Sequence, residues 1–122
     1  MTDNPKKILV VEDEKPLLHA LELKLRHEGF IVTTAADGQI CLDLIAKQRF
    51  DVLLLDLVMP IVDGFQVLQK LQDAPNKPST IFVLSNLSQT EDEQRVRTLG
   101  AQKLFIKSDT ALSVIVDEIK KL

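Results

Sequence analysis

The sequence contains no tryptophan and no tyrosine, and of these three aromatic residue types it has only phenylalanine, at five positions. Bases of single-stranded nucleic acid stack on such rings, so this mode of binding has no platform. Dense runs of lysine and arginine are missing as well, and the formal net charge is −3. Because phosphate contacts need clustered basic residues, we expect no direct nucleic-acid binding.

Cysteine and long apolar runs are equally scarce. Cys41 is the only cysteine, which excludes an internal disulfide, and its apolar neighbours predict a packing role. Apolar runs stay well below the roughly 18 residues that span a membrane, and residues 1–7 lack the apolar core of a signal peptide. We therefore expect a single domain over residues 1–122, without an output domain, in the cytoplasm and away from membranes.

Strand-like and helix-like segments alternate along the whole chain. Short apolar or β-branched runs predict strands at 8–11, 31–35, 52–56, 80–85 and 103–106. Amphipathic stretches predict helices at 15–28, 38–48, 64–72, 90–99 and 110–122. Five such β–α units predict an α/β fold, a doubly wound five-stranded parallel sheet in the flavodoxin-like order 2-1-3-4-5 with five helices on two faces.

Two of the helices carry more specific expectations. The second is expected to turn Ile40, Cys41, Leu44 and Ile45 inward. The fourth is so highly charged and so short of apolar anchors that we expect it to pack loosely.

Polar side chains gather at the expected carboxyl ends of four strands, the edge where doubly wound sheets bind ligands. These side chains are Glu12 and Asp13 after the first strand, Asp56 at the end of the third, Ser85 at the end of the fourth, and Lys107 after the fifth. Clustered carboxylates repel one another and need a cation. Oxygen ligands without histidine or cysteine suit Mg²⁺ or Mn²⁺ rather than zinc. Glu14 is interpreted as an acid that complements the dipole of the first helix.

Asp56 is the most informative of these residues, because it ends the otherwise apolar run Val52–Asp56. A buried charge is expensive unless something compensates it, so the strand presents this acid for use. A carboxylate can be the nucleophile of phosphoryl transfer. Donors for the remaining phosphate oxygens would be Lys107, Ser85 and the backbone N–H groups of Leu57 and Asn86. The residues therefore predict a metal-assisted aspartyl-phosphate site.

Four motifs together resemble the receiver domain of two-component response regulators, over roughly residues 6–122. They are Glu12-Asp13, Leu55-Asp56-Leu57-Val58-Met59-Pro60 through Asp63-Gly64, Ser85, and Lys107. The resemblance implies that Asp56 accepts a phosphoryl group from a histidine kinase or a histidine phosphotransfer protein. It also implies that Asp13, Asp56 and the carbonyl of Val58 coordinate Mg²⁺ directly, while Glu12 acts through water.

The resemblance further implies a switch. Lys107 would pair with the phosphate, and Ser85 would move to bond it. The fourth helix, fifth strand and fifth helix would form the output face for a downstream protein or an output domain, and a homodimer through the last helix is compatible with the sequence. Such a protein takes part in its own phosphotransfer and dephosphorylation, although it is mainly a regulator.

Several positions depart from the family pattern. Leu104 stands where the family usually has an aromatic switch residue, and strand alternation is expected to point Phe105 the other way. Ser108 replaces the usual proline after the lysine, and because a non-proline cis bond costs about 2.5–4 kcal/mol we expect a trans bond or a differently shaped loop. Val58 and Leu87 are apolar at positions that tune dephosphorylation in the family, which predicts a long-lived phosphorylated form.

Three other kinds of protein share features with a phosphorylated receiver. An FMN-binding flavodoxin-like protein needs a Ser/Thr/Gly-rich loop after the first strand, where this chain has acids. A haloacid-dehalogenase-type phosphatase needs a second aspartate at the position of Val58. A pseudo-receiver, which uses the same fold as an unphosphorylated interaction or dimerisation module, is the alternative that Leu104 and Ser108 leave open.

Overall fold

The chain folds around a parallel sheet whose strands run side by side through the middle of the molecule. The computed structural model describes residues 5–87 and 89–122. Residues 1–4 belong to the segment that was expected not to be a signal peptide, and they lie outside the described residues. The strands are β1 (Lys7–Val11), β2 (Ile31–Ala35), β3 (Val52–Asp56), β4 (Thr80–Ser85) and β5 (Lys103–Ile106). They pair in parallel in the order β2-β1-β3-β4-β5, which confirms the predicted doubly wound topology.

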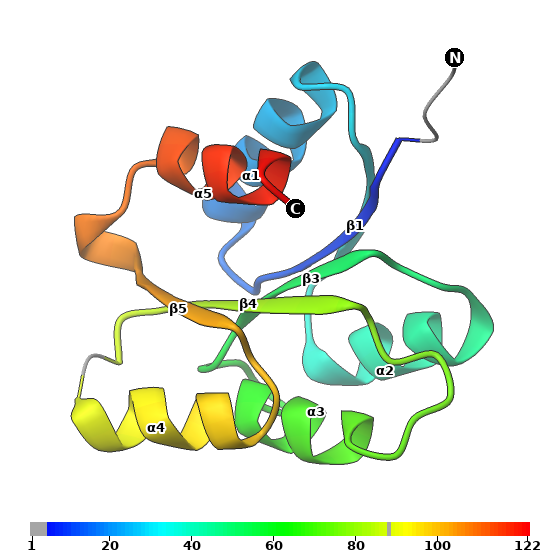
Figure 1. Ribbon diagram of the computed structural model, residues 1–122, viewed down its shortest axis with the longest axis vertical. Coiled ribbons are helices and arrows are strands. Elements are labelled where there is room, and N and C mark those ends of the chain that lie inside the picture. The colour runs from blue at the N-terminus through cyan, green and yellow to red at the C-terminus, as the bar shows by residue number, and fades with distance from the viewer. Residues whose placement is uncertain (1–4, 88) are drawn as a thin grey trace.

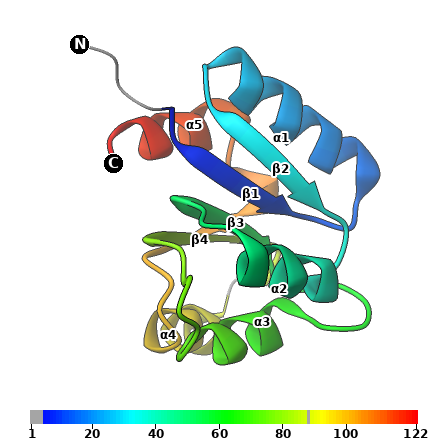
Figure 2. The ribbon, with the colours of Figure 1, turned by 90° about the vertical axis from the view of Figure 1, so that its right-hand side faces the viewer.

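Helices cover both faces of this sheet. In the described part of the chain they are α1 (Lys15–His27), α2 (Gly38–Lys47), α3 (Gly64–Leu71), α4 (Thr90–Thr98) and α5 (Leu112–Lys120). Figures 1 and 2 show α1 and α5 on one face, and α2, α3 and α4 on the other. Over the same residues, no helix combines the length and the apolar character that crossing a membrane requires.

Side chains of the central strands alternate between two apolar layers. Leu9 and Leu53 belong to the layer under α2 and α3, whereas Ile8 and Leu54 belong to the layer under α1 and α5. Every residue of β3 is buried, as expected for a central parallel strand that is covered on both faces. The strand that carries Asp56 is therefore held firmly from both sides.

The start of α3 is fixed directly beside Asp56. Asp63 caps the helix through a reciprocal pair of hydrogen bonds, in which its Oδ1 accepts from the N–H of Gln66 at 2.9 Å and its own N–H donates to Gln66 Oε1 at 2.9 Å. A Cβ at Gly64 would lie 2.4 Å from the carbonyl oxygen of Asp56. Only glycine permits this approach, and the predicted helix start at residue 64 is confirmed.

Two details of the prediction are wrong. The last helix was expected over residues 110–122, but it spans Leu112–Lys120, and Lys107–Asp109 forms a separate 3₁₀ turn, η1. Ile40 was expected to point inward, but it is 42% exposed. The buried stripe of α2 runs through Cys41 and Ile45, and this four-residue spacing turns the residue before Cys41 toward solvent.

Helix α4 is held by few apolar contacts, as its composition predicted. Val96 is its one buried residue among those the structure describes. The guanidinium of Arg95 lies 3.9 Å from the centre of the Phe65 ring on α3, a cation–π contact that adds a polar attachment. Few side chains therefore attach this helix to the rest of the domain.

Candidate functional site

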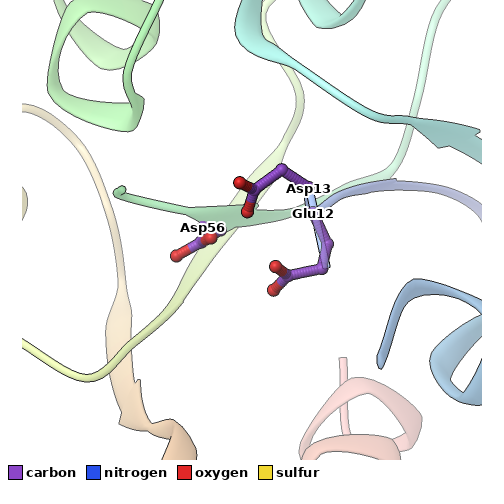
Figure 3. A group of neighbouring side chains, drawn as sticks. All are labelled: Glu12, Asp13 and Asp56. Atoms are coloured by element: carbon purple, nitrogen blue, oxygen red, sulfur yellow. The ribbon is translucent and has the colours of Figure 1, made fainter. Parts of the chain in front are cut away.

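Three carboxylates meet at the carboxyl edge of the sheet. Glu12 and Asp13 follow β1, which pairs with β3 up to Val11 and Leu55, so they lie next to Asp56. One oxygen from each carboxylate lies within 4.8 Å of the others, and Figure 3 shows the three groups gathered around the end of β3. Glu12 and Asp56 are buried, whereas Asp13 is exposed.

Lys107 places its ammonium group among these acids. Its Nζ lies 2.8 Å from Glu12 Oε1 and 3.2 Å from Asp56 Oδ2. A third carboxylate, that of Glu14, approaches the same Nζ at 3.2 Å. The lysine side chain is only 13% exposed, so these attractions are weakly screened by solvent.

The pKa shifts show that the ammonium does not fully offset the acids. Burial raises the pKa of Glu12 to about 7, despite the neighbouring ammonium, and the charge of Asp56 adds to this effect. Burial likewise raises the pKa of Asp56 against the opposing attraction of Lys107. Burial acts to lower the pKa of Lys107, but the close ionic contact with Glu12 and the charges of Asp56 and Glu12 outweigh it and raise that pKa. The ionised site still favours additional positive charge.

The donor set fits a hydrated divalent cation. Among the described residues, the buried Glu12 Oε1 makes its ion pair with Lys107 but has no hydrogen-bond partner of good geometry. Glu12 Oε1 thus has a single ionic contact, and a water molecule in a cation's hydration shell would add a hydrogen bond to it. Mg²⁺ prefers oxygen ligands, uses one or two carboxylates and retains several waters. Glu12, Asp13 and Asp56 provide this kind of site.

A cleft of about 340 Å³ opens beside Asp56. It is lined by Asp13, Glu14, Asp56, Val58, Ser85, Asn86, Leu87 and Lys107. The buried Ser85 turns its Oγ to accept the N–H of Leu87 at 3.1 Å. A hydroxyl that accepts one N–H keeps its own proton for an anion, so the cleft offers an ammonium group and a hydroxyl facing a carboxylate.

The loop after β3 is tied to the same carboxylate. The N–H of Val58 donates to Asp56 Oδ1 at 3.3 Å, and the Val58 side chain is 62% exposed at the rim of the cleft. Leu57, expected to offer a backbone N–H, has its side chain buried in the core. The apolar Val58 and Leu87 thus line the cleft beside Asp56.

The two residues of β5 expected to belong to a switch point to opposite faces of the sheet. Leu104 packs against the layer under α2, α3 and α4. Phe105 lies in the other layer, with its ring edge-to-face against Phe82 at 5.5 Å between centroids. This confirms the alternation predicted from the sequence. The Lys107–Ser108 bond is also trans as expected, since the described part of the chain contains no cis peptide bond.

Two side-chain roles at the site escaped sequence reasoning. Glu14 makes no cap hydrogen bond at the start of α1 and instead contacts Lys107, a residue 93 positions away. Asn86, expected to act only through its backbone, accepts the N–H of Ser108 on its side-chain Oδ1 at 3.1 Å. Both contacts join segments far apart in sequence, so no local pattern predicts them.

Comparison with known proteins places these observations in a family context. A family model described as the response regulator receiver domain matches residues 8–119. Response regulator ArlR of Staphylococcus aureus is 35% identical over 101 residues, which cover 83% of this chain and 45% of ArlR. The chain thus spans less than half the length of the curated relatives that it matches.

Solved structures show the same similarity. The receiver domain of Francisella response regulator 1452 superposes with a TM-score of 0.88 at 27% identity, covering 95% of this chain and 94% of that one. Chemotaxis protein CheY4 of Vibrio cholerae gives a TM-score of 0.88 at 26% identity, covering 97% and 98% of the two chains.

Proposed function

The chain belongs to the response regulator receiver domain family, and from this premise we propose that it is a phosphorylation-dependent signalling switch with Asp56 as the phosphoacceptor. The proposal rests on the groups that surround the Asp56 carboxylate. Asp56 is buried at the end of β3, beside two acids, with the Lys107 ammonium 3.2 Å away. A structural acid would need neither the acidic neighbours nor the open cleft.

Mg²⁺ would be held by Asp13 and Asp56, with Glu12 acting through a bound water and the Val58 carbonyl completing the site. Bound there, the cation supplies positive charge that neutralises the acids and the incoming phosphoryl oxygens. The raised pKa values of Glu12 and Asp56 support a site whose ionised form needs such a cation. Mn²⁺ shares the preference for oxygen ligands and would substitute.

Asp56 then acts as a nucleophile toward phosphohistidine of a histidine kinase or a histidine phosphotransfer protein. One carboxylate oxygen attacks phosphorus while the P–N bond to the donor imidazole breaks, and its electron pair stays on the nitrogen, which takes a proton from solvent. Lys107, 13% exposed and already beside Asp56, would neutralise the transferred oxygens. The backbone N–H groups of Leu57 and Asn86 would donate further hydrogen bonds.

Ser85 would report the phosphorylated state. Its Oγ now accepts from the Leu87 N–H at 3.1 Å, and a movement of Ser85 that brings its hydroxyl proton to a phosphoryl oxygen would pull the loop before α4. That helix is anchored by Val96 as its one buried residue in the described part of the chain, which makes it easy to shift. Leu104, beneath this face, would take part as an aliphatic rather than an aromatic switch residue.

The surface formed by α4, β5 and α5 is the proposed output face, where a downstream protein or an output domain would bind. ArlR and the other curated relatives are longer than this chain, which supports an output domain as one form of the partner. A second copy of this chain, meeting through α5, is another. In each case, the phosphoryl group on Asp56 biases a two-state surface.

Beryllofluoride with Mg²⁺, which mimics an aspartyl phosphate, tests the proposal in ¹⁵N-labelled protein. We expect amide shifts at Asp56, Ser85 and Lys107 and along α4, and none of these in an Asp56→Asn variant. A spectrum that does not move at the first three positions would instead support the pseudo-receiver, an interaction module that works without phosphorylation.

A further inference from the structure

A hydrogen bond joins the two loops that flank the cleft beyond the ends of their strands. Pairing of β4 with β5 ends at Ser85 and Ile106. Past this point, Asn86 Oδ1 accepts the N–H of Ser108 at 3.1 Å. The side chain of Asn86 therefore continues the hydrogen bonding between β4 and β5 beyond the strands. It connects the loop after Ser85 to the turn that carries Lys107.

The turn that presents Lys107 has N–H groups without acceptors of their own. Lys107 opens the 3₁₀ turn η1, and the first N–H groups of any helical turn lack acceptors within the turn. Ile106 precedes the turn and has no side-chain oxygen to cap it. Asn86 provides the missing acceptor from a separate loop, and Ser108, unlike a proline at that position, has the N–H to donate.

The same turn determines where the lysine ammonium lies. The Lys107 Nζ lies 3.2 Å from Asp56 Oδ2 and 2.8 Å from Glu12 Oε1. A long, flexible side chain reaches both oxygens at once only if its backbone is held in place. We infer that Asn86 is a positioning residue of the phosphoryl site, acting through Ser108 to hold the turn from which Lys107 reaches Asp56.

This inference rests on the proposed function and extends it to the relay. The Asn86 N–H is expected to contact the phosphoryl group, while the Asn86 side chain is bonded to the Lys107 turn. A movement of Ser85 toward the phosphoryl group therefore draws the neighbouring turn with it. The two loops would then move together. This movement would link the cleft to the output face without an aromatic residue at position 104.

Affinity for beryllofluoride at saturating Mg²⁺, measured by calorimetry, tests the inference. Asn86→Leu keeps the approximate shape of the side chain but removes the acceptor, and we expect affinity to fall roughly two- to tenfold. The affinity for Mg²⁺ alone should not fall, because Glu12, Asp13 and Asp56 keep their positions. Asn76→Leu, the same chemical change in the loop after α3, is the matched control and should behave as the parent chain.

Two further measurements separate a positioning role from a general structural one. The Ser108 amide should exchange slowly with solvent in the parent chain and in Asn86→Asp, which keeps an acceptor, but rapidly in Asn86→Leu. Ser108→Pro removes the donor, and adding Asn86→Leu to it should cause little further loss, since both changes break one bond.

Each outcome is decisive. If the parent chain binds beryllofluoride and Asn86→Leu binds equally well, the inference is overturned while the proposed function stands. Equal losses of Mg²⁺ and beryllofluoride affinity would also overturn it, because they would indicate a general disturbance of the site. A parent chain that binds no beryllofluoride with Mg²⁺ would overturn the proposed function and this inference with it.

Discussion

Replacing Glu12 with glutamine should make the protein more stable, although it removes an ion-pair partner of Lys107. Glu12 is 1% exposed, and its burial, together with the charge of Asp56, raises its pKa to about 7 from an ordinary value of 4.5. The ionised carboxylate is therefore unfavourable in the folded state. A neutral side chain of nearly the same shape avoids this penalty.

The magnitude follows from the two pKa values. Between about pH 4.5 and 7, folded Glu12 holds a proton that the unfolded chain has lost, so stability declines as the pH rises through this window and levels off above it. The full difference corresponds to about 3 kcal/mol at alkaline pH. Glu12→Gln should gain an amount of this order at about pH 8.5, and almost none at about pH 4.5.

Urea unfolding followed by circular dichroism measures this gain, because the chain has no tryptophan for fluorescence. The experiment is run with a chelator, and again with Mg²⁺, which should shrink the gain by neutralising the parent site. Glu14→Gln, at an exposed neighbouring acid, is the control and should change stability by less than about 1 kcal/mol. A gain independent of pH, or a loss of stability at alkaline pH, would refute the electrostatic account.

Three further predictions follow from the packing and the rim of the cleft. Gly64→Ala should lower the free energy of unfolding by about 2 kcal/mol or more in urea titrations, because a Cβ would lie 2.4 Å from the Asp56 carbonyl oxygen; unchanged stability would contradict that contact. Burial raises the pKa of the Cys41 thiol to about 12, so a thiol reagent should label it only as fast as the chain unfolds, and rapid labelling of folded protein would show the packing role to be wrong. Val58→Asn with Leu87→Glu should shorten the lifetime of the phosphorylated form at least roughly tenfold in a mass-spectrometric time course, because polar side chains there can orient an attacking water; an equal lifetime in the parent chain would count against slow dephosphorylation.

Most of the fold could be predicted because its signals are local. The continuous apolar run of β3 reflects burial on both faces, and Gly29 with its φ of 95° ends α1 as a sequence pattern indicates. The 3₁₀ turn after β5 could not be predicted in this way. Within it, Ser108 donates its N–H to Asn86 Oδ1, and Asn86 lies 22 residues earlier in the chain.

The candidate site shows the same division. The proximity of Asp56, Asp13 and Lys107 could be predicted, because the topology places the carboxyl ends of all the strands at one edge of the sheet. The role of the Glu14 side chain could not be predicted. An acid just before a helix can complement the helix dipole or form an ion pair, and here it pairs with Lys107. Only the path of the chain in space decides between the two.

Intact-mass detection of phosphorylation tests the central claim most directly. The chain is incubated with a small-molecule phosphodonor such as acetyl phosphate, with Mg²⁺ or with a chelator, beside an Asp56→Asn variant. We predict one added phosphoryl group in the parent chain with Mg²⁺, and none with the chelator or in the variant. Equal labelling of the parent and the variant, or no labelling of the parent, would contradict Asp56 as the phosphoacceptor.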